Sequence, residues 1–474
     1  MPDPGGYDAR VHPTLDDPVA TAASEGVGGP VGEHASPHRW WTPLRVVLAF
    51  TAIWFALGMV QKAPCYQDSW LDGQARYSQM CYSDLPYLYV GRGFVELNWP
   101  YDGDPETRAR YDTMEYPVGI SYFAWGTAWL THWVTGSPDV DTRAQVPTGD
   151  LYSDPQVVKE IRTYVAVSAV LLGAAALAAA WFLARTHRDR PWDAALFALS
   201  PALLVNGLVN WDLLSVALVA AALWAWSRDR PVLTGVLIGL GTATKLYPLF
   251  LLGGILVICL RRRAWPDLLR VSVSALGTWV LANAPAYLTG HEQWSVFWTF
   301  NEQRGADLGS LWLVWQQAGH TVTPEVINTA SWIFFGAWCA AVLVIGLLAP
   351  EPPRLAQLGF LVVAGFLLVN KVYSPQYVLW LLPLAVLARP RWRDQLVWQA
   401  GELLYFAAVW WYLGGFLAPA SGGDAGFYWA ATVIRVAAEL YLVAMVVRDI
   451  WYPRNDPVRA TAYVTTTRSK AVAV

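Results

Sequence analysis

The chain of 474 residues carries only 15% charged residues against 55% hydrophobic ones, and its mean hydropathy is +0.31. A soluble chain would hold about a quarter charged residues, so the composition predicts an integral membrane protein in contact with membrane lipids. The formal net charge of -3 gives no electrostatic basis for a nucleic-acid partner.

The two ends of the chain differ in composition from the rest. The first residues are rich in Pro, Gly, Asp and Ala, and they lack the basic start and apolar run of a cleavable signal peptide. We therefore predict a disordered cytoplasmic tail over residues 1–42 and another over residues 453–474. A single transmembrane domain, residues 43–452, is expected between them.

Apolar stretches that can span a membrane recur along this domain. They begin near Pro43, Ile161, Ala194, Trp211, Val232, Leu246, Leu268, Thr329, Leu355, Tyr377, Leu396 and Tyr428. Each is long enough to cross about 30 Å of hydrocarbon as a helix, or is plausible as a shorter or broken span. The expected fold is an all-α polytopic bundle of about twelve transmembrane helices.

Basic residues set the expected orientation of this bundle in the plasma membrane. If the spans alternate, the arginine-rich connections fall on one side, which the positive-inside rule makes cytoplasmic. These connections contain Arg39, Arg45, Arg185, Arg188, Arg190, Arg228, Arg230, Arg261, Arg262, Arg263, Arg354, Arg389, Arg391, Arg393, Arg448 and Arg454. Both termini are then cytoplasmic. The extracytoplasmic side receives a long first loop, residues 61–160, and the segment 290–328.

Two apolar stretches do not fit simple spans. Counting residues 118–134 as a span would put a basic connection outside, so we expect an interfacial or re-entrant helix with Trp125, Trp129 and Trp133 at helical spacing. Residues 232–260 are too long for one span and too short for two. A pair of helices broken near Lys245-Leu246-Tyr247-Pro248 keeps the basic connections on both sides of this stretch on the same face of the membrane. Such a break in the helix needs protein or a polar cavity around it.

Two of the four cysteines, Cys65 and Cys81, lie in the first loop, where an oxidising compartment permits a disulfide. The alternative is a pair of unpaired thiols. Cys259 and Cys339 lie in spans.

Unusual polar residues gather in the extracytoplasmic half of the expected fold. They are Asp84, Glu115, Asp212, Lys245, Arg304, Lys371 and Gln376. An ionisable group within a span is costly unless it is paired or faces a cavity, so Asp212, Lys245 and Lys371 are candidates for function. The alternative is a structural ion pair between Asp212 and a lysine.

The first loop and the segment 297–312 combine polar groups with aromatic rings. Asp84 and Glu115 lie among aromatics, and this combination suits sugar handling because a carboxylate can accept a hydroxyl proton. Arg304 suits a phosphate because its planar fork donates two parallel hydrogen bonds. The alternative for Arg304 is an interfacial arginine bonded to Asp307.

Several kinds of site have no signature in this sequence. It contains no phosphate-cradling P-loop and no dinucleotide fingerprint, and its seven histidines lack metal-ligand spacing. We therefore expect no cofactor and identify no metal ligands, while dependence on a metal stays open. A membrane-soluble donor is easier to accommodate than a cytosolic nucleotide sugar.

Several short motifs, in chain order, resemble membrane glycosyltransferases of the GT-C type. They are Ser83-Asp84, Glu115-Tyr116-Pro117 before the interfacial helix, Asn210-Trp211-Asp212-Leu213-Leu214 and Lys245-Leu246-Tyr247-Pro248. A later segment, Lys371 to Trp380, resembles part of the eukaryotic GPI mannosyltransferase I catalytic subunit. The nearest resemblance is to glycosyltransferase family 87, the actinobacterial polyprenyl-phosphate-mannose-dependent α-mannosyltransferases.

This resemblance implies a polyprenyl-phosphate sugar as donor and a hydroxyl acceptor on a glycolipid, lipoglycan or glycoprotein. It implies inverting transfer at the outer leaflet, with Asp84 as general base and Glu115 positioning the acceptor. Arg304 and Lys371 would hold the lipid phosphate, with Lys245 and Gln376 as further phosphate candidates. Asp212, Tyr116 and Tyr377 complete the predicted site. The first loop lacks the second acidic residue that GPI mannosyltransferases carry beside this aspartate.

Two other classes of protein compete with this hypothesis. A transporter or flippase of a lipid-linked sugar would also place charge in a membrane cavity. A transporter or flippase is expected to have a binding site near the membrane midplane and two related halves. In this sequence the polar residues cluster near one face, and no internal repeat is visible. A purely structural scaffold would not need lysines within spans.

Overall fold

A computed structural model describes residues 17–28, 38–417 and 425–460, and over these residues every regular element is helical. Four helices are long and apolar enough to cross a membrane, namely α2 (Pro43–Gln61), α8 (Pro155–Thr186), α17 (Pro324–Leu348) and α21 (Gly426–Trp451). Shorter apolar helices accompany them. The prediction of an all-α polytopic membrane protein is confirmed, whereas the expected number of spans stays a prediction.

The remaining helices at the predicted spans follow the expected order. They are α11 (Leu213–Trp226), α12 (Pro231–Thr244), α13 (Leu251–Arg262), α14 (Trp265–Thr289), α18 (Leu355–Val369), α19 (Val378–Ala388) and α20 (Trp392–Leu413). Prolines begin many helices because their missing N–H is unpaired there in any case. At α2, Pro43 follows Thr42, whose hydroxyl accepts a hydrogen bond from the Arg45 amide.

Two predicted spans are interrupted. The expected break near Lys245 is present: α12 ends at Thr244, Lys245 is extended, and a short 3₁₀ turn, η5 (Tyr247–Phe250), leads into α13. The stretch expected from Ala194 is also not one helix. It divides into η4 (Pro191–Ala194), α9 (Ala195–Ala198) and α10 (Pro201–Asn206), because Pro201 starts a new helix capped by the Ser200 side chain.

The first loop forms several short helices and one longer one. They are α3 (Ala63–Gln67), α4 (Ala75–Ser78), α5 (Leu85–Gly91), η1 (Phe94–Glu96), α6 (Pro105–Arg110), α7 (Val118–Val134), η2 (Asp141–Gln145) and η3 (Asp150–Ser153). The predicted helix over residues 118–134 is confirmed as α7, which packs against α8. The tryptophans of α7 have different surroundings. The Trp125 indole donates a hydrogen bond to the Leu97 carbonyl at 3.0 Å, whereas Trp133 is 76% exposed.

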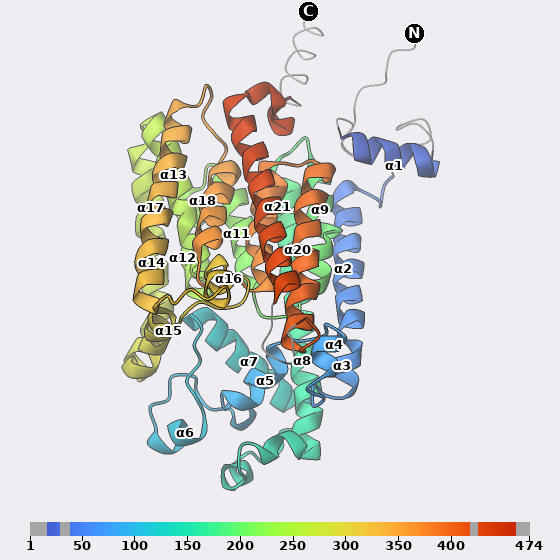
Figure 1. The fold of residues 1–474 in the computed structure, drawn as a ribbon, viewed down its shortest axis with the longest axis vertical. Helices are drawn as coiled ribbons and strands as arrows, with labels where there is room; N and C mark the ends of the chain where they lie inside the picture. Colours follow the sequence, from blue (N-terminus) through green and yellow to red (C-terminus); the bar gives the residue numbers. More distant parts are fainter. Residues whose placement is uncertain (1–16, 29–37, 418–424, 461–474) are drawn as a thin grey trace, which may run out of the picture.

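The first-loop helices gather at one end of the bundle (Figure 1). Two further helices, α15 (His291–Gln303) and α16 (Leu311–Gln317), follow α14, and α15 lies at the same end of the molecule as α6 and α7. At the opposite end lie α1 (Pro18–Gly28) and the last turns of α21. The segments predicted to be extracytoplasmic therefore share one end of the protein.

Parts of both predicted tails form regular elements, since Pro18–Gly28 is α-helical and Pro453–Asn455 is a 3₁₀ turn, whereas the division of the chain into two tails and a transmembrane domain stays a prediction. Asp17, before α1, is buried and accepts a hydrogen bond from the Trp392 amide at 2.8 Å. Asp456, after η7 (Pro453–Asn455), is fully buried and pairs with Arg354 at 2.9 Å. Composition could not reveal these distant partners. The rest of both predicted tails, residues 1–16, 29–37 and 461–474, lies outside the described residues.

Candidate active site

A cavity of about 910 Å³ lies among the first loop, α15, the ends of α17 and α18, and the turn after α18. The predicted site residues that line it are Asp84, Glu115, Tyr116, Lys245, Arg304, Lys371, Gln376 and Tyr377. Asp212 is completely buried and touches the cavity only through its partners. The structure thus brings together residues that are dispersed over most of the sequence, while their chemical roles stay predictions.

Asp84 stands immediately before α5, with both carboxylate oxygens hydrogen bonded. The Tyr82 hydroxyl donates to Oδ1 at 2.8 Å, and the Asn210 side-chain amide donates to Oδ2 at 2.6 Å. The same amide also lies 2.8 Å from the Tyr116 hydroxyl. Burial raises the pKa of Asp84, and the hydrogen bonds from Asn210 and Tyr82 partly offset this rise because they stabilise the charged form. A carboxylate with a raised pKa beside a cavity is suited to accept a proton.

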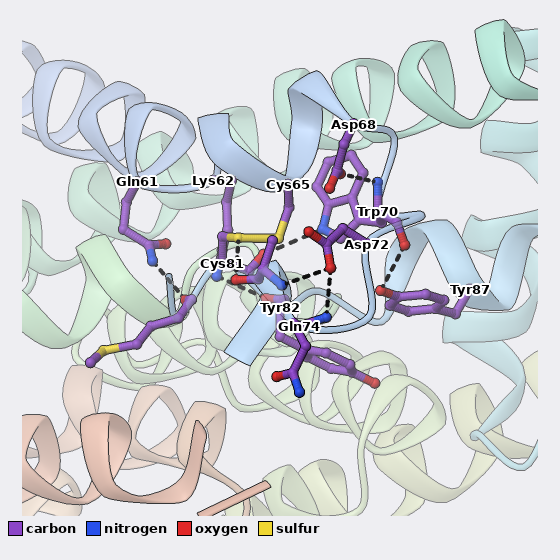
Figure 2. The surroundings of a disulfide bond; sticks show 12 residues. Gln61, Lys62, Cys65, Asp68, Trp70, Asp72, Gln74, Cys81, Tyr82 and Tyr87 are labelled. Atoms are coloured by element: carbon purple, nitrogen blue, oxygen red, sulfur yellow. Dashed lines mark hydrogen bonds between the residues drawn. A yellow bond between two sulfur atoms is a disulfide. The ribbon is translucent and has the colours of Figure 1, made fainter. Parts of the chain in front are cut away.

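A disulfide anchors the segment that leads to Asp84. Cys65, on α3, is bonded to Cys81, so the sequence alternative of two free thiols is excluded (Figure 2). Both cysteines are fully buried. The Trp70 indole also donates to the Cys81 carbonyl at 3.3 Å. The chain three residues before Asp84 is therefore fixed to the loop that follows α2.

Side chains at the end of α2 hold the neighbouring carbonyl groups. The Gln61 amide donates to the Met80 carbonyl at 2.7 Å, and the buried Lys62 ammonium donates to the Tyr82 carbonyl at 2.8 Å (Figure 2). On the other side, the Asp84 amide donates to the Val209 carbonyl at 2.8 Å. These contacts fix the backbone around the carboxylate before any substrate binds, which is what a precisely positioned base requires.

Glu115 is paired with an arginine that the sequence analysis did not single out. Arg92 donates from Nε to Oε2 at 2.9 Å and from Nη2 to Oε1 at 3.0 Å, a bidentate geometry. The carboxylate still lines the cavity. Because Arg92 already balances its charge, Glu115 is better suited to bind a hydroxyl than to act as the primary base.

The alternative interpretation of Asp212, an ion pair with a lysine, is observed in the structure. Lys245 Nζ lies 3.4 Å from Asp212 Oδ1, and the Trp380 indole donates to the same oxygen at 2.6 Å. The Lys245 ammonium also lies 4.7 Å from the centre of the Tyr116 ring and lines the cavity. Trp380 in turn stacks on Tyr377, with ring centres 3.9 Å apart. Asp212 therefore orients a cation and an aromatic stack at the cavity wall.

Arg304 and Lys371 supply positive charge to another part of the cavity. Arg304 pairs with Asp307 through Nε, at 2.9 Å, and through Nη2. The sequence alternative for Arg304 is thus observed, although the side chain also lines the cavity. Lys371 Nζ donates to Asn328 Oδ1 at 2.6 Å and to the Glu302 carbonyl at 3.2 Å. Burial, and next the positive charge of Arg304, lower the pKa of Lys371.

Two turns carry these cations, and they are hydrogen bonded to each other. The Asp307 amide donates to the Lys371 carbonyl at 2.8 Å, and the Tyr373 amide donates to the Leu308 carbonyl at 3.0 Å. This pairing explains how residues far apart in sequence come to share one wall of the cavity. We call residues 304–310 the arginine turn and residues 370–376 the lysine turn.

The remaining wall is apolar, and Trp332 and Phe335 of α17 face it together with Phe366 and Val369 of α18. Such a surface fits a hydrocarbon chain next to a polar head group. Among the residues that the structure describes, no group of three or more His, Cys, Asp or Glu could hold a metal ion.

Three residues that shape the site were not among those predicted from the sequence, namely Tyr82, Asn210 and Arg92. Asn210 carried a signal, because it opens the motif Asn210-Trp211-Asp212 quoted above. Tyr82 is adjacent to the motif that contains Asp84. Arg92 carried no signal, since nothing in its local sequence indicates a partner 23 residues away.

The fold and this cavity define a polytopic membrane protein with a charged, substrate-sized site at one end of its bundle. Residues 156–370 match the sequence model of Glycosyltransferase family 87, and this part of the chain is a family 87 membrane glycosyltransferase domain. The predicted resemblance is thereby confirmed over these residues. No curated protein matches the chain.

The matched region contains Asp212, Lys245 and Arg304. Asp84, Glu115 and Tyr116 precede it, and Lys371, Gln376 and Tyr377 follow it. The geometry therefore adds to the family match, because residues outside the matched region share one cavity with residues inside it.

Proposed function

We propose that this protein transfers a sugar from a polyprenyl-phosphate donor to an acceptor hydroxyl at the extracytoplasmic face of the plasma membrane. The observation that carries the proposal is a single cavity lined by a half-buried carboxylate, Asp84, two cations, Arg304 and Lys371, and an apolar wall. These features match the three parts of the reaction: a hydroxyl that must lose a proton, a phosphate and a hydrocarbon chain.

In the proposed step, the acceptor oxygen attacks the anomeric carbon of the donor while its proton passes to Asp84. The bond between that carbon and the phosphate oxygen breaks, and its electron pair leaves with the polyprenyl phosphate. Arg304 and Lys371 stabilise the charge that develops on the phosphate. Attack opposite the leaving group inverts the anomeric centre. The family resemblance favours mannose as the sugar.

The acceptor is expected to reach Asp84 beside Glu115. The bidentate pair with Arg92 orients the Glu115 carboxylate, so it can accept a hydrogen bond from a second acceptor hydroxyl. A glycolipid, lipoglycan or glycoprotein presents several hydroxyls on neighbouring carbons and fits this arrangement. Lys245 and Gln376, which also line the cavity, are further candidates for binding the donor phosphate.

The test uses purified full-length protein with a panel of polyprenyl-phosphate sugars, including mannose and glucose, and octyl α-mannoside as the hydroxyl probe. We expect consumption of one donor with formation of a disaccharide product of inverted configuration. Binding of a donor without release of polyprenyl phosphate would favour the competing hypothesis, a transporter or flippase of a lipid-linked sugar.

A further inference from the structure

A cluster of charged residues lies within the bundle behind the lysine turn. Arg435 and Glu439 of α21 and Glu402 of α20 are each at most 3% exposed. Arg435 Nε lies 2.7 Å from Glu402 Oε2. The Tyr373 hydroxyl donates to Glu439 Oε2 at 2.8 Å. Burying three ionisable groups between helices is expensive, and such groups usually mark a functional site.

The cluster contacts the lysine turn through its backbone. The Arg435 guanidinium donates from Nη1 to the Tyr373 carbonyl and from Nη2 to the Ser374 carbonyl, the latter at 3.3 Å. The guanidinium carbon also lies 3.3 Å from the centre of the Tyr373 ring. Arg435 therefore holds the backbone of the lysine turn between Lys371 and Gln376. These are the two residues of the turn that are predicted to bind a phosphate.

The arginine turn packs against the same Tyr373 backbone. Gly309 has φ +78, and a Cβ at this position would lie only 2.1 Å from the Tyr373 carbonyl oxygen. The Gly309 amide donates to the Tyr428 hydroxyl of α21 at 2.8 Å. Glycine is needed here both for its left-handed backbone and for the close approach of the two turns.

From these contacts we infer that the cluster of Arg435, Glu402 and Glu439 is a positioning device for both phosphate-binding cations. One buried guanidinium fixes the Tyr373 peptide, and that peptide sets the lysine turn directly and the arginine turn through Gly309. Arg304 and Lys371 would otherwise be long, mobile side chains on separate loops. This inference rests on the proposed function and names Arg435 and Gly309 as residues that act on the donor phosphate through others.

The experiment measures affinity for polyprenyl phosphate alone, by tryptophan fluorescence of the full chain in detergent, and then donor KM and kcat. Arg435→Lys keeps the charge but cannot bond Glu402 and both carbonyls together. Gly309→Ala disturbs the contact of the two turns without touching a buried charge. We expect each to weaken polyprenyl-phosphate binding and to raise donor KM by about tenfold, the loss expected for a charge-assisted hydrogen bond, with kcat and acceptor KM changed less.

A matched control is available at Arg389, which follows α19 and contacts the same two helices. Arg389 is also buried and joins Asp394 of α20 to Asp449 of α21, at 2.8 and 2.7 Å, but it does not line the cavity. Arg389→Lys should lower the thermal midpoint and leave polyprenyl-phosphate binding unchanged. In a chain that already carries Arg304→Ala and Lys371→Ala, Arg435→Lys should cause no further loss of binding, since positioning acts through those two cations.

The results that overturn the inference are distinct from failure of the proposed function. Wild-type protein that binds polyprenyl phosphate but transfers no sugar would contradict the function and leave the binding comparison intact. Unchanged binding in both Arg435→Lys and Gly309→Ala, equal losses in Arg389→Lys, or no binding by the wild type would each refute the positioning role. If Arg435→Lys does not fold, Gly309→Ala decides alone.

Discussion

The side-chain amide of Asn210 donates a 2.6 Å hydrogen bond to the carboxylate of Asp84, across 126 residues of sequence. This contact orients one carboxylate oxygen, and it stabilises the ionised form of a group whose pKa burial raises. A general base must be ionised before it can take a proton. The bond from Asn210 therefore bears directly on the pH range in which Asp84 can act.

The first prediction concerns the acid side of the pH profile. Turnover should fall as pH drops through the raised pKa of Asp84, because protonation removes the base. Asn210→Ala removes a hydrogen bond that lowers this pKa, so the pKa rises further and the acid limb of kcat/KM should move to higher pH. Rates measured across pH on wild type and variant check the sign. An acid limb that moves to lower pH in the variant would refute the assignment of Asp84 as the group whose protonation produces that limb.

A second prediction addresses the cations at the cavity. Lys371→Ala or Arg304→Ala should weaken use of the lipid donor by roughly ten- to a hundredfold, since each removes a charge-assisted hydrogen bond to phosphate worth about 1.5 to 3 kcal/mol. Donor KM and detergent stability, measured on the same preparations, check this. Loss of thermal stability with normal donor dependence would favour the purely structural pairs with Asp307 and Asn328.

Matched controls exist for both substitutions. Arg270 forms an exposed pair with Asp267 at 3.0 Å, at the same spacing of three residues as Arg304 with Asp307, but away from the cavity. Lys159 is an exposed lysine on the first turns of α8. Arg270→Ala and Lys159→Ala should leave donor KM unchanged.

Sequence could predict the elements whose signals are local. The break at Lys245 followed from the length of an apolar stretch that contains Pro248, and α7 followed from its Trp spacing. Asp84, Glu115, Arg304 and Lys371 were found because they are polar groups at unusual positions or in motifs.

What sequence could not predict is which distant groups would meet. Asn210 was quoted only as part of a motif, and Arg92 and Arg435 were not singled out, because their importance depends on partners brought close by packing. The same holds for Asp456, which composition assigned to a tail. In the structure its side chain is buried and forms an ion pair with Arg354.

A third prediction concerns the disulfide. Cys65 and Cys81 close a loop with a sequence separation of 16 residues, and a loop of about that length is expected to contribute about 3 kcal/mol to the free energy of unfolding. The double variant Cys65→Ser, Cys81→Ser should melt at a lower temperature and lose turnover, because the segment before Asp84 is released. Cys339→Ser, which removes a free thiol, is the control. Unaltered turnover in the double variant would show that the disulfide does not position Asp84.

The fourth prediction concerns topology. Basic connections predict cytoplasmic termini, with the first loop and the cavity on the opposite side of the membrane. A reporter that is active only in the periplasm should be inactive when fused after Val474 and active when inserted into the exposed loop at Asp139. Activity after Val474 would overturn the predicted orientation and, with it, the extracytoplasmic active site.

The most direct test of the account is the turnover of Asp84→Asn with the donor that the wild type consumes. The substitution keeps the shape of the side chain and removes its capacity to accept a proton, so expression, detergent stability and donor binding should stay close to normal. Turnover should fall by at least about two orders of magnitude, the lower end of what a positioned base contributes. Asp68→Asn, Asp72→Asn, Asp102→Asn and Asp104→Asn, which change first-loop carboxylates outside the cavity lining, should each keep most activity. Near-normal turnover of Asp84→Asn would contradict the account and make Glu115 the next candidate for the base.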